Sequence, residues 1–95
     1  MQNTETINVT YQELAQALKL LHFKNEKTSD TLIYSYPKFN AIIKLRLPKS
    51  PEDLVQGGIL QGHAFILQEK GILKKADALF KIIEHQRYIQ ENVLV

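Results

Sequence analysis

The stretch TLIYSYPKFNAIIKLRL, residues 31–47, decides the fold class of this chain. Residues 31–36 are rich in β-branched and aromatic side chains, and the turn-forming run at 37–40 follows, so we expect a strand and then a turn. Residues 41–47 alternate between two faces and predict a further strand. One face of that strand carries Ala41, Ile43, Leu45 and Leu47, and the other carries Ile42, Lys44 and Arg46.

Upstream of this stretch the sequence predicts one more, weaker strand. Residues 22–27 form a short run anchored by Phe23, and Thr28, Ser29 and Asp30 supply hydroxyl and carboxylate groups that favour a turn. Strands joined by such short turns pair as antiparallel neighbours. We therefore expect a three-stranded antiparallel meander whose apolar face is covered by helices.

A helix over residues 11–21 precedes the strands. Thr10 and Glu13 have the spacing of a capping box, in which each side chain bonds the other residue's backbone amide. An apolar stripe follows at helical spacing. Its members are Tyr11, Leu14, Leu18 and Leu21.

Two more helices are predicted after the strands. A polar connection with two prolines, residues 48–53, leads to a helix over 59–70 that ends at Gly71, a residue suited to the left-handed conformation. The predicted inward residues are Ile59, Leu60, Ala64, Ile66 and Leu67. A last helix is expected over 74–90. Its apolar face consists of Ala76, Leu79, Phe80, Ile82 and Ile83.

The predicted fold class is α+β, with the order α-β-β-β-α and an extra C-terminal helix. We expect a single domain over residues 1–95, because 95 residues suffice for one core only. It divides into a tail at 1–9, an αβββα core at 10–73, and the added helix and tail at 74–95. The apolar C-terminal end provides candidate interaction residues for a homodimer. These are Tyr88, Ile89, Val93 and Leu94.

Composition excludes several classes of function. The chain has no cysteine, which removes disulfides, thiolate metal sites and cysteine nucleophiles. No apolar run approaches the roughly 20 residues that cross a bilayer, and residues 1–6 lack a secretory pattern. The histidines lack metal-ligand spacing. We expect a soluble cytoplasmic protein with no membrane contact, no metal and no cofactor.

Positive charge is concentrated in the middle of the chain. Residues 22–50 carry six basic and two acidic side chains, whereas residues 51–95 carry five basic and six acidic ones. Lys24, Lys44 and Arg46 are therefore candidate nucleic-acid-binding residues. The nearby rings of Tyr34, Tyr36 and Phe39 are candidates for base stacking, with core packing as the alternative interpretation.

Together, several short motifs resemble the HicA/YcfA-like family of small proteins with a double-stranded-RNA-binding-like αβββα fold. The matching stretches lie within residues 10–73. They are Tyr11-Gln12-Glu13-Leu14 with Leu18, Phe23, Leu32-Ile33-Tyr34, Leu45-Arg46-Leu47-Pro48, and Ile66-Leu67-Gln68-Glu69-Lys70-Gly71-Ile72. The resemblance implies a relation to toxin–antitoxin proteins, in which the toxin is a ribonuclease inhibited by a small antitoxin.

The family's ribonuclease histidine stands just before the second strand, within a Gly-Ser-His stretch. This chain has Ser29, Asp30 and Thr31 there. Neither aspartate nor threonine replaces an imidazole near neutral pH, so we do not expect the family's nuclease chemistry. An active ribonuclease would need His22 or His63 instead.

Two functions from different classes remain. The first is a HicA-like protein-interaction or oligomerisation module, with a second copy or an antitoxin-like protein as partner. The alternative is an RNA-binding or polyanion-binding module that uses Lys24, Lys44 and Arg46. The interaction module requires no residue that the chain lacks, so it is the first hypothesis.

Overall fold

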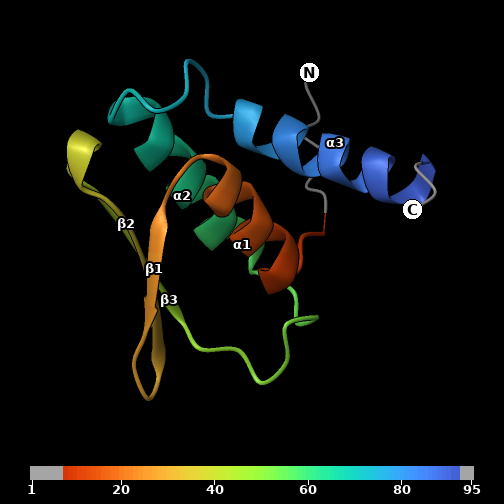
Figure 1. Ribbon diagram of the computed structural model, residues 1–95, viewed down its shortest axis with the longest axis horizontal. Helices are drawn as coiled ribbons and strands as arrows, with labels where there is room; N and C mark the ends of the chain where they lie inside the picture. Colours follow the sequence, from red (N-terminus) through yellow and green to blue (C-terminus); the bar gives the residue numbers. More distant parts are fainter. Residues whose placement is uncertain (1–7, 93–95) are drawn as a thin grey trace.

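A computed structural model describes residues 8–92 and confirms the α+β class and the antiparallel meander. Figure 1 shows the strands on one side of the molecule and the three helices on the other. The elements in chain order are α1 (Tyr11–Leu20), β1 (Lys24–Lys27), β2 (Thr31–Tyr36), the 3₁₀ turn η1 (Pro37–Phe39), β3 (Ala41–Arg46), α2 (Gly57–Glu69) and α3 (Ala78–Asn92).

The start of α1 is fully hydrogen-bonded. Thr10 Oγ1 accepts from the Glu13 amide at 3.1 Å, and Glu13 Oε1 accepts from the Thr10 amide at 3.0 Å, which is the predicted capping box. The amides of Tyr11 and Gln12 donate to the carbonyls of Asp53 and Pro51, both at 3.0 Å. The connection before α2 therefore closes over this helix end.

The first strand was predicted to begin at His22, and this is wrong. His22 has φ 72°, a left-handed conformation that ends α1. The amide of His22 donates to the Lys19 carbonyl at 2.9 Å, and the amide of Phe23 donates to the Leu18 carbonyl at 3.0 Å. These two bonds form a Schellman motif, so β1 begins only at Lys24.

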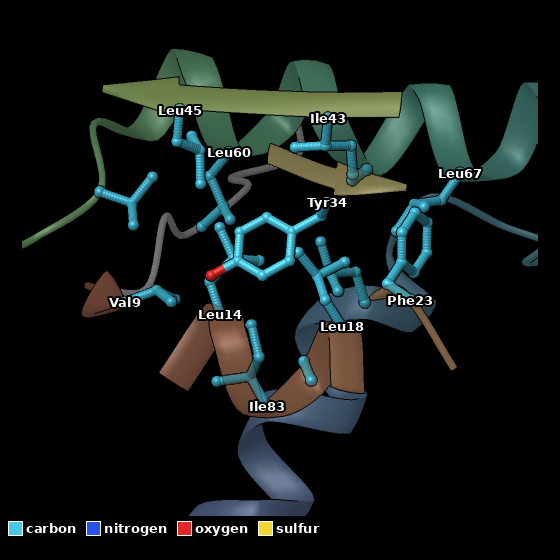
Figure 2. Packing of buried hydrophobic residues seen from close by; sticks show 14 of the residues in the cluster. Val9, Leu14, Leu18, Phe23, Tyr34, Ile43, Leu45, Leu60, Leu67 and Ile83 are labelled. Atoms are coloured by element: carbon cyan, nitrogen blue, oxygen red, sulfur yellow. The ribbon is translucent and has the colours of Figure 1, made fainter. Parts of the chain in front are cut away.

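The sheet has the order β1-β2-β3, and β2 has the predicted bounds. Strand β3 alternates strictly between buried and exposed residues, as predicted, but it ends one residue early, at Arg46. Its inward side chains meet α1 and α2 around the ring of Tyr34 (Figure 2). The opposite face of the sheet is left uncovered by the helices (Figure 1).

The helix α2 begins at Gly57, two residues before the predicted start, and ends with the Schellman motif predicted at Gly71. The Ile72 amide donates to the Leu67 carbonyl at 2.9 Å, and the Gly71 amide to the Gln68 carbonyl at 3.1 Å. The buried stripe of this helix is Leu60, Ala64 and Leu67. Ile59, predicted to face inward, is exposed instead, because it lies about 100° around the helix from Leu60.

The helix α3 begins at Ala78 rather than near Lys74. Before it, the backbone forms turns, and the Ala76 amide donates to Gln68 Oε1 at 2.8 Å. Leu79 and Ile83 are fully buried in the same cluster as the αβββα elements. The C-terminal helix is therefore part of the one core that the described residues form.

One ion pair joins α1 to α3 within residues 8–92. Arg87 donates through Nε and Nη2 to the Glu13 carboxylate, with Nη2 and Oε1 2.7 Å apart, and Nη2 also donates to the Asn8 carbonyl. The hydrogen bond from Arg87 lowers the pKa of Glu13. The capping glutamate of α1 is thus also the anchor of the last helix.

Candidate functional site

The uncovered face of the sheet carries the three predicted cations. Ser35 of β2 pairs with Lys24 on one side and Ile42 on the other, and Ile33 pairs with Lys44. Because directly paired residues share a face, Lys24, Lys44 and Arg46 lie on the same face. However, Lys24 is two strands away from the others, about 10 Å.

An acidic side chain interrupts this face. Ile33 pairs with Glu26 on β1 and with Lys44 on β3, so Glu26 lies in the same cross-strand row as Lys44. The three cations therefore do not form an unbroken positive stripe. Only Lys44 and Arg46 remain as a close pair, two residues apart on one strand.

The aromatic rings predicted to accompany the cations face the other way. Tyr34 is 6% exposed and lies in the core cluster. Tyr36 packs edge-on against Phe23 at 5.5 Å and against Phe39 at 4.9 Å between ring centroids. The interpretation of these rings as core packing is therefore correct, and they do not provide a stacking platform beside Lys44 and Arg46.

A groove of about 370 Å³ runs between β3 and α2. Tyr11 and Leu45 contribute to it. Its walls otherwise consist of Lys44 and Arg46 on the strand and Ile59, Gly62, His63 and Ile66 on the helix. A Cβ added at Gly62 would meet nothing within 4 Å, so this wall is open at its centre. The groove combines two cations with a largely apolar helical wall.

His63 lines this groove with unsatisfied ring nitrogens. Both Nδ1 and Nε2 are buried and have no hydrogen-bond partner. Desolvation lowers the pKa of His63 below its ordinary value of 6.5, so the ring is neutral at pH 7. A buried polar group without a partner destabilises the fold. The sequence indicated that His63 lacks metal-ligand spacing and named it as an alternative to the missing nuclease histidine, but its burial was not predicted.

The solvent side of α2 carries no charged residue before Glu69. From Gly57 to Gln68 the helix contains no Asp, Glu, Lys or Arg, although it lies at the surface. Phe65 is 62% exposed and Ile59 is 41% exposed. Surface helices normally carry charged residues on the side that faces water. This helix therefore presents a surface suited to contact with another molecule.

A second hollow, of about 420 Å³, lies between α1 and the connection that follows β3. Lys27, Lys49 and the buried Tyr34 contribute to it, and Tyr11 lines both hollows. Burial raises the pKa of Tyr34, so its hydroxyl stays protonated at neutral pH. Apolar residues such as Leu32 and Leu47 also line this hollow, but it does not border α2.

The interaction residues predicted at the C-terminal end are only partly described. Tyr88 is 62% exposed and Ile89 is 36% exposed on α3. Val93 and Leu94 lie outside the described residues. Within residues 8–92, α3 alternates exposed apolar side chains with charged ones such as Glu84 and Glu91, in contrast to the uncharged α2.

The turn at the position of the family's ribonuclease histidine is held by local hydrogen bonds. The Thr31 hydroxyl donates to Asp30 Oδ1 at 3.0 Å, and Thr28 Oγ1 accepts from the Thr31 amide at 3.1 Å. These side chains stabilise the link between β1 and β2. His63 lies instead in the groove beside α2, and His22 ends α1.

Compared with known proteins, the chain matches no family model, no curated protein and no solved structure. Among residues 8–92, no cluster of three or more His, Cys, Asp or Glu side chains has the geometry to hold a metal ion. Within the same described part, every helix is too short or too polar to cross a bilayer.

Proposed function

We propose that this chain is a protein-interaction module of HicA-like architecture that pairs with a second copy of itself through α2. The observation that carries the proposal is the exposure of Phe65 and Ile59 on a helix without a charged residue from Gly57 to Gln68. Burial of a large aromatic side chain in an interface is strongly favourable.

A second copy is the partner that fits this surface best. In a two-fold dimer the same patch meets itself, so a charged patch would repel its copy. The twelve uncharged residues of α2 avoid that repulsion, whereas Tyr88 and Ile89 on α3 are flanked by charged side chains. The proposed dimer contact therefore moves from the C-terminal end to α2.

Polyanion binding is favoured less by the geometry. Lys44 and Arg46 are exposed and adjacent on β3, but Glu26 interrupts the basic face and the aromatic rings lie on the opposite face. A single-stranded nucleic acid is held by cations together with stacking rings. This function remains a hypothesis, and steep loss of RNA affinity with rising salt would support it.

The oligomeric state tests the proposed dimer. Light scattering of the full chain should give a dimer mass at tens of micromolar, and Phe65→Lys should give a monomer. Tyr88→Lys, at an aromatic position of α3 that is equally exposed, is the matched control and should stay dimeric. A monomeric wild-type chain, or a monomer produced by Tyr88→Lys alone, would contradict the proposal.

A further inference from the structure

We propose that the free edge of β3 binds an extended acidic segment of another protein, which joins the sheet as a fourth strand. This site shares Ile59 with the proposed dimer contact but does not include Phe65. Its supporting features are an unpaired strand edge, two cations at that edge, and the apolar wall of α2 alongside it.

The backbone of β3 has an available edge. Strand β3 is the last strand of the sheet, and the Leu47 amide donates to the Asp30 carbonyl on the β2 side. In an antiparallel pair every second residue bonds the partner strand. Leu45, Ile43 and Ala41 therefore face β2. The amides and carbonyls directed to the free edge belong to Ile42, Lys44 and Arg46.

The same register fixes the side-chain pattern of the added strand. Residues paired with Lys44 and Arg46 would place their side chains on the uncovered face, beside these two cations. The residues between them would point toward the groove and the wall formed by Ile59 and Ile66. The favoured segment therefore alternates acidic and apolar residues.

A second copy of this chain is a poor occupant of the edge. Pairing β3 with its own copy would bring Lys44 and Arg46 close to the same cations of the copy, and like charges placed opposite each other destabilise a strand pair. Edge lysines are a common protection against such pairing. Within residues 8–92 neither Lys44 nor Arg46 has an ion-pair partner, so both remain available to carboxylates.

A nucleic acid is also a poorer occupant than a peptide. It could use Lys44 and Arg46, but it would leave the amides and carbonyls of the β3 edge without backbone partners. Addition of a peptide strand satisfies these groups and fills an apolar groove with alternate side chains. The wall of α2 consists of Ile59, Gly62, His63 and Ile66, and it carries no Lys or Arg to pair with a phosphate.

A synthetic peptide TVEVEVT, blocked at both ends, is the probe. In amide NMR of the full chain we expect saturable shifts at Ile42, Lys44 and Arg46, together with slower hydrogen exchange of these amides. The peptide TVKVKVT, and a TVEVEVT peptide methylated at the two Glu amide nitrogens, should each bind at least about tenfold more weakly.

Charge reversal in the protein provides the matched test. Lys44→Glu with Arg46→Glu should weaken TVEVEVT binding at least about tenfold and strengthen TVKVKVT binding. Lys24→Glu with Lys38→Glu makes the same change of charge away from this edge and should leave both affinities unchanged. Binding by the monomeric variant Phe65→Lys would show that the edge site does not depend on the dimer.

Three results would overturn the proposal. The first is absence of TVEVEVT binding up to about 1 mM, which would leave Lys44 and Arg46 as edge protection only. The second is equal binding of the N-methylated peptide, which would exclude strand addition. The third is binding of an oligouridine RNA through Lys44 and Arg46 without protection of the β3 amides, which would favour a nucleic-acid surface.

Discussion

The helices α1 and α2 both pack against the sheet, but they differ in two respects. One is whether their polar groups have hydrogen-bond partners, and the other is whether their large apolar side chains are buried. In α1 the capping box is complete, the first amides have carbonyl partners, and Glu13 anchors Arg87. In α2 no side chain caps the N-terminus, His63 has no hydrogen-bond partner, and Phe65 faces solvent. Polar groups are satisfied at the start of α1 and left without partners in α2, which supports the proposal that α2 contacts a partner.

The largest contrast concerns one apolar residue from each helix. Leu18 on α1 is fully buried, so Leu18→Ala should lower the free energy of unfolding by about 2–5 kcal/mol. Phe65→Ala on α2 should change it by less than about 0.5 kcal/mol, because the side chain is mostly exposed. Urea denaturation of dilute protein measures both values. A large loss with Phe65→Ala would mean that α2 is not a free surface.

The next largest change in stability is expected from the ion pair between Arg87 and Glu13. Arg87→Ala should lower the free energy of unfolding by about 1–2 kcal/mol, since it removes charge-assisted hydrogen bonds to Glu13 and Asn8 from a partly exposed site. Lys81→Ala, at an exposed position of the same helix, is the control and should have little effect.

The difference in the free energy of unfolding between wild type and Arg87→Ala should also depend on pH. The pKa of Glu13 is lowered in the folded state, so its stabilisation is present above the ordinary value of 4.5 and is lost as the pH falls below it. Denaturation at pH 7 and pH 3 should therefore show a smaller gap between wild type and Arg87→Ala at pH 3. An unchanged gap would contradict the role of Arg87 as the partner of this carboxylate.

On α2, the stability of the fold should depend on pH through His63. Since burial lowers its pKa, the unfolded chain takes up a proton at higher pH than the folded chain does, and stability falls as the pH drops through 6.5. His63→Leu should remove this fall and raise the free energy of unfolding at pH 7 by about 1 kcal/mol. Denaturation at pH 7.5 and pH 5.5 measures this fall. His85→Leu, at an exposed position of α3, is the control and should leave the fall in place.

The smallest changes in the free energy of unfolding are expected at the C-terminal ends of α1 and α2. Both end in a Schellman motif, but the left-handed residue is His22 in α1 and Gly71 in α2. His22→Gly should raise the free energy of unfolding by about 0.5–1 kcal/mol, and Gly71→Ala should lower it by about 1 kcal/mol. Changes of the same sign in thermal denaturation would contradict this interpretation of the two ends.

Local sequence signals predicted much of this fold. The capping box of Thr10 and Glu13, the strand at 31–36 and the alternation of β3 each depend on residues a few positions apart. The end of α1 was harder to predict, because His22 occupies a left-handed position where glycine is usual. The pair of Arg87 and Glu13 was not predictable from spacing, since 74 positions separate the two residues.

The candidate site was only partly visible in the sequence. Lys44 and Arg46 were identified as surface cations from their alternation, but the groove depends on where α2 lies beside β3, which no local pattern reports. The absence of charge from Gly57 to Gln68 is visible in the sequence, but the exposed side of α2 was not predicted, and Ile59 was expected to face inward. Phe65 was the available signal, because it lies opposite Leu60 and Leu67 at helical spacing.

The contact of Arg87 with Asn8 and Glu13 has a consequence for biosynthesis. It joins the beginning of the described chain to its last helix, and Leu79 and Ile83 complete the hydrophobic cluster from the same helix. During translation, the meander and α2 leave the ribosome before this closing element does. The nascent polypeptide therefore lacks two fully buried members of its core, Leu79 and Ile83, until the final helix emerges.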